Sequence, residues 1–423
     1  MSRAQQDRTG RARADGVVHA VTATFAAAGA VMGANVARVP ALRDQLSATE
    51  SQLGLALVGV GIGSIAAMPF TARLVRRFGT GRVVLAGTVI AGVAWIGVGS
   101  TASVAVAMAF LVLAGTGFGV WDVAMNVAGH TAEERDRRSW MPRLHAAFSG
   151  GAVIGAGLAA LAVRAGLGPL PQFVLVAVGS VAVVAACVPR FLPVAPAPQR
   201  TPDQRGRTSG PSLWRSPAVL VIGLVVLGTA LGEGAANDWL ALTLVDTRGA
   251  SESLAALAFA GFNAAMLVGR LVGGGAIDRY GRTAVVRVCG TTAAVGVALV
   301  SLVPSLPVAL AGALLWGLGL SVVFPAGMSA AGEAVPGRGA EAIAVTATIG
   351  YGGFLLGPPL LGFLAESWGL DRSLLVVATL AAMVALLAGA VRERRPASVQ
   401  RVTAPAEASE EVDELTTAER CPT

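Results

Sequence analysis

Residues 104–129 read VAVAMAFLVLAGTGFGVWDVAMNVAG, an apolar run in which Asp122 is the only charged residue. A helix rises about 1.5 Å per residue, so about 20 apolar residues span the hydrocarbon core of a bilayer. Over the whole 423-residue chain, 54% of the residues are hydrophobic, 13% are charged and the mean hydropathy is +0.67. Too few polar residues remain to cover a soluble protein, so the sequence predicts an all-α polytopic membrane protein.

Further apolar runs of similar length follow one another along the chain, separated by short polar stretches. Together they predict twelve transmembrane helices, six on either side of a polar, proline-rich stretch at residues 191–216. The predicted helices cover residues 17–38, 52–72, 83–101, 104–129, 141–165, 170–189, 217–243, 253–277, 284–303, 306–332, 340–366 and 371–391.

The arginines predict how the chain is oriented. All 32 basic residues are arginine, the net charge is +7 and the pI is near 10.7. Most of them lie in loops and termini on one side of the predicted helices, which is the positive-inside pattern and not the basic stripe of a nucleic-acid-binding protein. The exceptions are Arg38, Arg43, Arg164, Arg248 and Arg372, while Arg270 lies near a helix end.

This pattern predicts that both termini are cytoplasmic and that the chain has a lipid bilayer, not a nucleic acid, as its partner. The excess of alanine, valine and glycine is typical of a GC-rich bacterial genome. We therefore expect a multi-pass protein of the bacterial inner (plasma) membrane.

The same reasoning divides the chain into regions. We expect a cytoplasmic N-terminal arm at residues 1–16, six-helix bundles at 17–190 and 217–392, and a cytoplasmic linker at 191–216. The tail at 393–423 is rich in alanine and glutamate and has few apolar residues to bury, so we expect it to be cytoplasmic and disordered.

A repeat relates the two halves at an offset of 202 residues. Matches between glycines arise easily in a glycine-rich chain, but one ungapped register across several helices favours a duplication. Parallel six-helix repeats are typical of alternating-access transporters, whose substrate site lies between the repeats. The matches include Asn35 with Asn237, Gly79 with Gly281, Gly115 with Gly317 and Gly117 with Gly319.

Residues 273–282, GGGAIDRYGR, connect the eighth and ninth predicted helices. This stretch resembles the cytoplasmic signature loop of the major facilitator superfamily. With the twelve helices, the central linker and the repeat, the resemblance covers about residues 17–392. It implies the major facilitator fold, in which two pseudo-symmetric six-helix bundles rock about a central cavity.

Three further stretches resemble bacterial members near the fucose-permease branch of sugar/proton symporters: residues 119–127 (GVWDVAMNV), 140–151 (WMPRLHAAFSGG) and 233–239 (EGAANDW). In that branch, helix 4 carries an acid four residues before an asparagine, and the acid is implicated in proton-coupled sugar uptake. Asp122 and Asn126 match these positions, with aspartate in place of the branch's glutamate. The acid of the branch's helix 1 has no counterpart in residues 29–35.

Two acids within predicted helices are candidates for proton coupling. Asp122 lies about two turns inside the fourth helix, where an unpaired carboxylate is costly and must be paired, hydrated or protonated. Its protonation can be linked to substrate loading and to a conformational switch. Glu233 in the glycine-rich seventh helix is the second candidate. The structural alternative for Asp122 is an internal polar clamp.

Asparagines near these acids are candidates for substrate binding. Asn126 and Asn237 each lie four residues after one of the acids and therefore share its helix face. Asn35, the repeat partner of Asn237, would face it across the pseudo-twofold axis if both line the cavity. Trp121 can stack on a sugar ring, although tryptophan also marks membrane interfaces.

Gating residues are expected near the cytoplasmic side. His145 lies close to the start of the fifth helix, where it can serve a gate or simply pack beside the helix terminus. The resemblance implies a conformational latch at Asp278, Arg279 and Arg282, because an acid at a helix end can meet an arginine in one state and release it in the other.

The first-half copy of this loop differs, because Arg76 occupies the position that corresponds to Asp278. A standard acidic latch cannot form there. We therefore hypothesise that Arg76 pairs with Glu341 at the start of the eleventh helix.

These features predict a secondary active transporter that takes up a small, sugar-like or otherwise hydrophilic substrate with protons (symport), by alternating access. Drug/proton antiporters of the superfamily usually carry an arginine in helix 4 and a glycine-proline signature in helix 5. Here Leu111 occupies the first position and residues 151–157 lack the proline, which favours uptake. The alternatives are a proton-driven drug or metabolite efflux antiporter and a non-transporting membrane receptor.

Other chemistry is not indicated. The sequence has no phosphate-binding loop that would drive transport by ATP, and we expect no cofactor. It also has no catalytic nucleophile paired with a general base, which would indicate an enzyme. The three histidines and three cysteines show no metal-ligand spacing, so we expect no metal site. Since one chain carries both repeats, we expect a monomer.

Overall fold

The computed structural model describes residues 3–136, 140–191, 212–336 and 338–393, and within these ranges every regular element is a helix. Twelve segments of the described chain are long and apolar enough to cross a membrane, which confirms the predicted spans. The first half contains α1 (Arg3–Val36), α2 (Val39–Leu46), α3 (Glu50–Phe78), α4 (Thr80–Gly99), α5 (Val104–Asp136), α6 (Met141–Arg164) and α7 (Pro169–Cys187).

The second half contains nine helices in the described residues, and a five-residue π-helix, Ala236–Leu240, joins the first two of them. These are α9 (Pro217–Ala235), α10 (Ala241–Arg248), α11 (Glu252–Tyr280), α12 (Arg282–Leu302), α13 (Leu306–Leu320), α14 (Val323–Ala334), α15 (Gly339–Trp368), α16 (Leu370–Ser373) and α17 (Leu375–Leu387).

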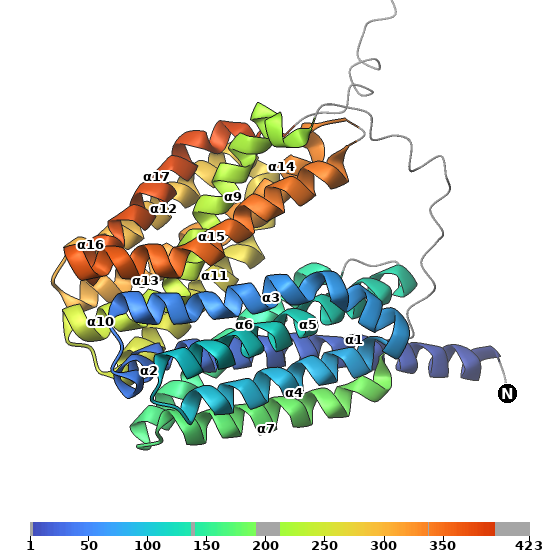
Figure 1. Ribbon diagram of the computed structural model, residues 1–423. Helices are drawn as coiled ribbons and strands as arrows, with labels where there is room; N and C mark the ends of the chain where they lie inside the picture. The colour runs from blue at the N-terminus through green and yellow to red at the C-terminus, as the bar shows by residue number, and fades with distance from the viewer. Residues whose placement is uncertain (1–2, 137–139, 192–211, 337, 394–423) are drawn as a thin grey trace, which may run out of the picture.

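Each half forms one bundle, so the predicted two-bundle architecture is confirmed (Figure 1). Residues 3–15, expected as an arm, continue the helix of the first span in α1. Most of the expected linker, residues 192–211, and the expected tail after residue 393 lie outside the described residues.

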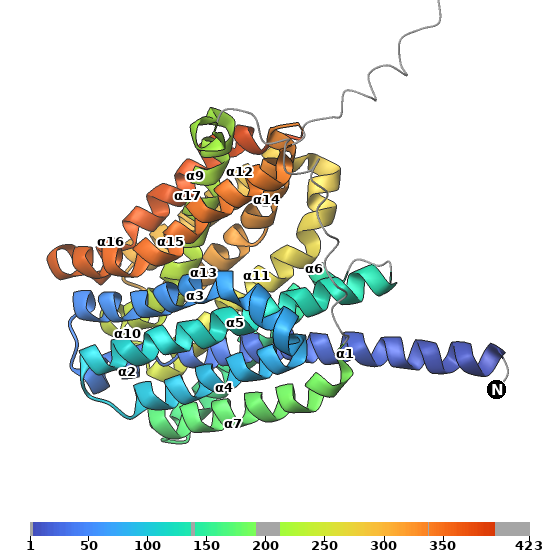
Figure 2. The ribbon, with the colours of Figure 1, turned by 45° about the vertical axis from the view of Figure 1, so that its right-hand side comes forward.

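The two bundles lie closer to each other at one end of the molecule than at the other. We call the end with the start of α1 and the α5–α6 and α11–α12 connections the arginine-rich end, and the end with α2, α10 and α16 the opposite end. In both views the bundles lie together at the opposite end and diverge toward the arginine-rich end (Figures 1 and 2).

Helix termini confirm that the two halves share one local design. Thr49 accepts a hydrogen bond from the backbone N–H of Gln52 at the start of α3, and Ser251, which is 202 residues later, accepts one from Leu254 at the start of α11. Those two helices end at Gly79 and Gly281, with φ of +82° and +81°. This left-handed region favours glycine, which explains why the loop glycine is present in both repeats.

The repeated glycines inside the helices allow close backbone contacts. A Cβ on Gly115 of α5 would overlap the carbonyl oxygen of Val60 on α3. A Cβ on Gly317 of α13 would overlap that of Phe262 on α11, and Val60 and Phe262 are themselves repeat partners. Small residues let membrane helices approach in this way, so the same packing joins the same helices in each bundle.

Polar contacts hold the two bundles together at the opposite end. Arg43 on α2 donates two hydrogen bonds to the Asp246 carboxylate on α10, one of them from Nη2 to Oδ1 at 3.1 Å. Arg38 Nη1 lies 3.4 Å from Glu252 Oε2. Burial acts to lower the pKa of the Arg43 guanidinium, but the carboxylates of Asp246 and Asp44 outweigh it and raise the pKa, so Arg43 remains charged. We call the Arg38–Glu252 and Arg43–Asp246 pairs the opposite-end lock.

Backbone packing reinforces this lock. A Cβ on Gly54 of α3 would lie 2.5 Å from the carbonyl oxygen of Pro358 on α15, and Ser51 Oγ donates a 2.6 Å hydrogen bond to Glu366. At the arginine-rich end, by contrast, no ion pair joins the bundles among the described residues. The structure is therefore closed at one end only.

A matched pair of glycines on α6 tests the close packing. Gly155→Ala places a methyl group against the backbone of Ala30 on α1, and overpacking of this kind costs about 1–3 kcal/mol. Gly157→Ala meets nothing within 4 Å. We expect the first variant to lower the unfolding temperature in detergent by a few degrees and the second to leave it unchanged or raise it. Equal stability of the two variants would contradict the packing described above.

A charge swap tests the opposite-end lock. Asp246→Arg places two arginines together and removes a pair of charge-assisted hydrogen bonds worth about 1.5–3 kcal/mol, so the opposite end should open. Spin labels at Ser100 and Leu302, at this end of different bundles, should report longer distances. The double variant Arg43→Asp/Asp246→Arg should restore the parent distance distribution. If the double variant stays open, the pair does not hold the bundles together.

Candidate functional site

Asp122 and Asn126 lie together on α5, about midway along the span. The Asn126 amide donates to the Asp122 carboxylate at 3.2 Å and to its backbone carbonyl at 2.8 Å. These residues are neighbours because they lie four apart on a helix, as the sequence predicts. Asp122 forms no ion pair within the described chain, and the carboxylate is half-buried.

Tyr351 of the second bundle approaches Asp122. It lies on α15, which packs along α3 of the first bundle, and its side chain is 42% exposed. The Tyr351 phenol lies within electrostatic range of the Asp122 carboxylate. A hydroxyl group of one bundle is therefore in the neighbourhood of the acid of the other.

Arg270 on α11 forms a second polar cluster that also joins the two bundles. Its Nη1 donates to Ser149 Oγ on α6 at 2.9 Å, and its Nε donates to the backbone carbonyl of Ser321 at 3.4 Å. Its Nη2 lies 3.8 Å from the Glu233 carboxylate on α9. His145, one turn before Ser149, is exposed and interacts electrostatically with Arg270. The structure thus places Glu233 beside Arg270, whereas the His145 ring packs edge-on against Phe25, 5.5 Å between ring centroids, as in the structural alternative.

These two clusters can contact a solute. Arg270 and Glu233 keep 27% and 23% of their side-chain surface exposed, although both lie inside predicted spans. An ionisable group in a span is costly in hydrocarbon and is found facing a bundle interior or water. Hydrogen-bond donors and acceptors from both bundles therefore meet in the region where the bundles diverge.

The glycine-rich stretch of the seventh span departs from regular α-helix three residues after Glu233. Residues Ala236–Leu240 form a π-helix, a feature that frequently lies at functional sites. Asn237 lies within it and is 8% exposed. The sequence predicts bending here from its glycines, and the structure places the irregularity next to the acid.

Two predicted substrate ligands lie elsewhere. Asn35 and Trp121 line a hollow of about 10 Å³ inside the first bundle, between α1, α4, α5 and α7. Trp121 is fully buried in the core of that bundle and Asn35 is 2% exposed. Asn35 is predicted to face the substrate as the repeat partner of Asn237, and Trp121 as the neighbour of Asp122, but the rotation of each helix directs both side chains into their own bundle. Asn35 consequently does not face Asn237.

Of the three residues expected to form the latch, Arg282 is the one that forms an ion pair among the described residues. Arg282 donates to both oxygens of Glu333, at 2.8 and 3.1 Å, and its backbone N–H donates to Glu393. Asp278 is exposed and forms no ion pair among the described residues, while the Arg279 guanidinium lies over the Tyr280 ring. Arg282, not Asp278, therefore holds this loop to the second bundle.

The hypothesised Arg76–Glu341 pair is not formed. Glu341 instead accepts hydrogen bonds from Arg338 at 2.6 and 2.9 Å. Arg338 lies three residues earlier and is a neighbour on the same helix turn, whereas Arg76 belongs to the other bundle and the bundles diverge at this end. Glu341 therefore pairs with Arg338, its neighbour along the chain, and not with Arg76.

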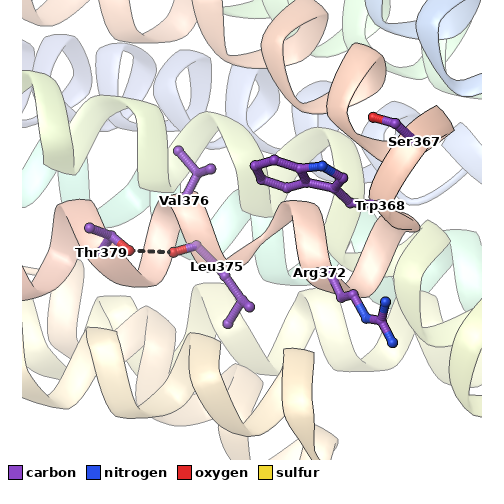
Figure 3. Close-up of a pocket in the computed structure, with 6 residues that line it drawn as sticks. All are labelled: Ser367, Trp368, Arg372, Leu375, Val376 and Thr379. Carbon is purple, nitrogen blue, oxygen red and sulfur yellow. Dashed lines mark hydrogen bonds between the residues drawn. The ribbon is translucent and has the colours of Figure 1, made fainter.

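One hollow lies far from these clusters. A cavity of about 380 Å³ at the opposite end is lined by residues of α15, α16 and α17, among them Trp368 and Arg372 (Figure 3). Its polar contacts are local, such as the hydrogen bond from Thr379 to the Leu375 carbonyl. It has no acid in its lining and does not reach the interface between the bundles, so we do not assign it as the transport site.

Sequence reasoning missed Arg270, Ser149 and Tyr351. For Arg270 a signal was present, since it falls seven residues inside the end of a predicted apolar span, residues 253–277. Ser149 and Tyr351 gave no such signal, because serine and tyrosine are common in membrane helices and only their contacts with the other bundle single them out.

Comparison with known proteins decides the family. Residues 20–242 and 222–417 match the Major Facilitator Superfamily. The chain belongs to this superfamily. The transporter is 32% identical over 375 residues to the "Uncharacterized transporter y4wD" of Sinorhizobium fredii, covering 88% of this chain and 97% of the relative. The family and this relative are transporters, not enzymes.

Solved structures show the same fold. The transporter superposes on a crystal structure of the nucleoside transporter NupG with a TM-score of 0.74 at 12% identity, covering 89% of this chain and 100% of that one. For the Escherichia coli fucose:proton symporter FucP the TM-score is 0.60 at 17% identity, covering 89% and 98%. The sequences have diverged widely, but the arrangement of the helices is retained.

Thiol labelling tests whether the space between the bundles is filled with water. In a cysteine-free background, His145→Cys should react rapidly with a water-soluble maleimide because its side chain is exposed toward Arg270. Leu144→Cys, next in sequence but 1% exposed, should not react. Leu175→Cys on α7 is 63% exposed on the outer surface of the first bundle and should react slowly in liposomes, since lipid covers it. Similar rates at His145 and Leu175 would show that the site is not hydrated.

Proposed function

We propose that this transporter takes up a small hydrophilic solute together with a proton by alternating access. The observation that carries the proposal is the Asp122 carboxylate, which lies inside a span with the Asn126 amide as its hydrogen-bond donor and with no arginine partner among the residues that the structure describes. A carboxylate in this position must be hydrated or protonated. A residue of this kind can load a proton on one side of the membrane and release it on the other.

Coupling requires that proton binding and solute binding affect each other. Asp122 belongs to the first bundle and the nearby Tyr351 to the second, so a solute between them contacts both bundles. A proton on Asp122 removes a negative charge from this interface and turns the carboxyl into a hydrogen-bond donor. Solute and proton can then stabilise the same closed state, and a ligand shifts a conformational equilibrium by its differential affinity for the two states.

The orientation follows from the charges. We take the arginine-rich end as cytoplasmic by the positive-inside rule, so the conformation is inward-facing, with the opposite-end lock closing the outer side. Transport then alternates between this state and one in which the lock opens and the arginine-rich ends meet. Because one chain supplies both bundles, we propose that the monomer is the working unit.

The nature of the cargo is supported by polarity and by similarity. The side chains that meet between the bundles are carboxyl, amide, hydroxyl and guanidinium groups, which suit a hydroxyl-bearing solute better than an apolar drug. The two solved structures are named for a nucleoside and for fucose with a proton, and the shared fold favours the same class of cargo.

The proposal is tested in proteoliposomes with a pH jump and a panel of sugars, polyols and cationic dyes. An inward proton gradient should drive accumulation of one hydrophilic solute, and Asp122→Asn should abolish accumulation while retaining exchange of labelled for unlabelled solute. Glu407→Gln, an acid of the C-terminal tail outside the predicted spans, is the control and should behave as the parent.

Two results would contradict the proposal. Movement of the dyes driven by the opposite gradient would identify an efflux antiporter. Solute flux that ignores the gradient and is unaffected by Asp122→Asn would reduce this residue to a structural clamp.

A further inference from the structure

Arg270 has an incomplete set of partners. It lies roughly 15 Å along the helix axis from the end of α11, well inside the span. Ser149 and the Ser321 carbonyl satisfy two of its donors but carry no charge. Its one acidic contact among the described residues, Glu233, is 3.8 Å away, which is too long for the charge-assisted hydrogen bond of about 2.7–2.9 Å that such pairs form.

The structural arginines of the same protein behave differently. Arg282 places both terminal nitrogens on the Glu333 carboxylate, at 2.8 and 3.1 Å. Arg338 donates from Nη2 and Nε to the two oxygens of Glu341, at 2.6 and 2.9 Å. Each of these guanidinium groups is paired with a carboxylate of the chain, whereas the Arg270 side chain is 27% exposed and no carboxylate of the described residues lies within hydrogen-bond distance of it.

On this basis we propose that Arg270 is a specificity-determining residue of the transport site and binds the carboxylate group of a small hydroxylated acid. The inference rests on the proposed transport function and names the class of its substrate. The planar guanidinium matches a carboxylate with two parallel hydrogen bonds. Asn126 and Tyr351 supply amide and hydroxyl groups for the remainder of the solute, while the buried Ser149 holds the guanidinium in place.

The charges around Arg270 favour a carboxylate over a phosphate. Glu233 lies beside the guanidinium, and Asp122 lies in the other polar cluster. A doubly charged phosphate would meet these acids with a single arginine to balance it, whereas a carboxylate carries one charge. Glu233 competes with the substrate for the positive charge of Arg270. Neutralising Glu233 removes this competing charge and allows the substrate carboxylate to bind the guanidinium.

The test is binding to the purified full-length protein in detergent, measured by the shift in unfolding temperature. Matched pairs are glucose with glucuronate and galactose with galacturonate, and glucose 6-phosphate is the phosphate arm. We expect at least one uronate to stabilise the parent at a concentration at which its neutral sugar and the phosphate do not. Arg270→Gln should weaken uronate binding about 10- to 100-fold, as expected for loss of charge-assisted hydrogen bonds.

Two further variants separate binding from a structural role. Glu233→Gln removes the competing charge and should strengthen uronate binding, which loss of a structural contact would not do. Arg270→Lys retains the charge but not the fork, so it should weaken binding and carries the test if Arg270→Gln does not fold. Arg287→Gln, an exposed arginine on α12, should bind as the parent does.

Several outcomes would overturn the inference: no response to either uronate, an equal response to the neutral sugars, a response to the phosphate alone, or unchanged uronate binding in Arg270→Gln. Because binding in detergent needs no gradient, these outcomes are independent of proton-coupled transport. Arg270-dependent uronate binding without gradient-driven accumulation would instead contradict the proposed function and leave this inference standing.

Discussion

A charge inside a bilayer-spanning helix must find a counter-ion, a proton or water, and the arrangement of this transporter follows from that constraint. Asp122, Glu233 and Arg270 lie in spans of different bundles, and each has only part of its requirement met within the chain. They can be accommodated only where the bundles diverge and hydration is available. We therefore propose the interface between the bundles as the place where a polar solute binds and where its binding affects the relation of the two bundles.

The rest of the fold allows this interface to change while the bundles remain intact. Inside each bundle, glycines at corresponding positions bring helix backbones into contact, as Gly115 does with Val60 and Gly317 with Phe262. Close-packed cores of this kind resist deformation, so motion is expected to be concentrated between the bundles. There α6 packs on α11 and α3 packs on α15, and the exposed Arg43–Asp246 pair can break and form again in water at modest cost.

Much of the architecture could be predicted because it is encoded locally. Apolar length determines the spans, and the spacing of four between Asp122 and Asn126 places them on one face whatever surrounds them. Contacts between distant segments could not be predicted in this way. Arg270 and Ser149 are 121 residues apart, and only the packing of α6 on α11 brings them together. The rotation of a helix about its axis is equally hidden, which is why Trp121 is buried in its bundle although its neighbour Asp122 faces the interface.

Coupling between proton and solute is the central claim, and proton movement measures it most directly. A pH-sensitive dye trapped in proteoliposomes, with no initial pH gradient, reports whether adding a sugar, polyol or sugar acid outside carries protons inward. We predict acidification of the lumen that depends on one such solute and is absent from protein-free liposomes and from Asp122→Asn. Uptake of the solute with no change in internal pH would contradict the account.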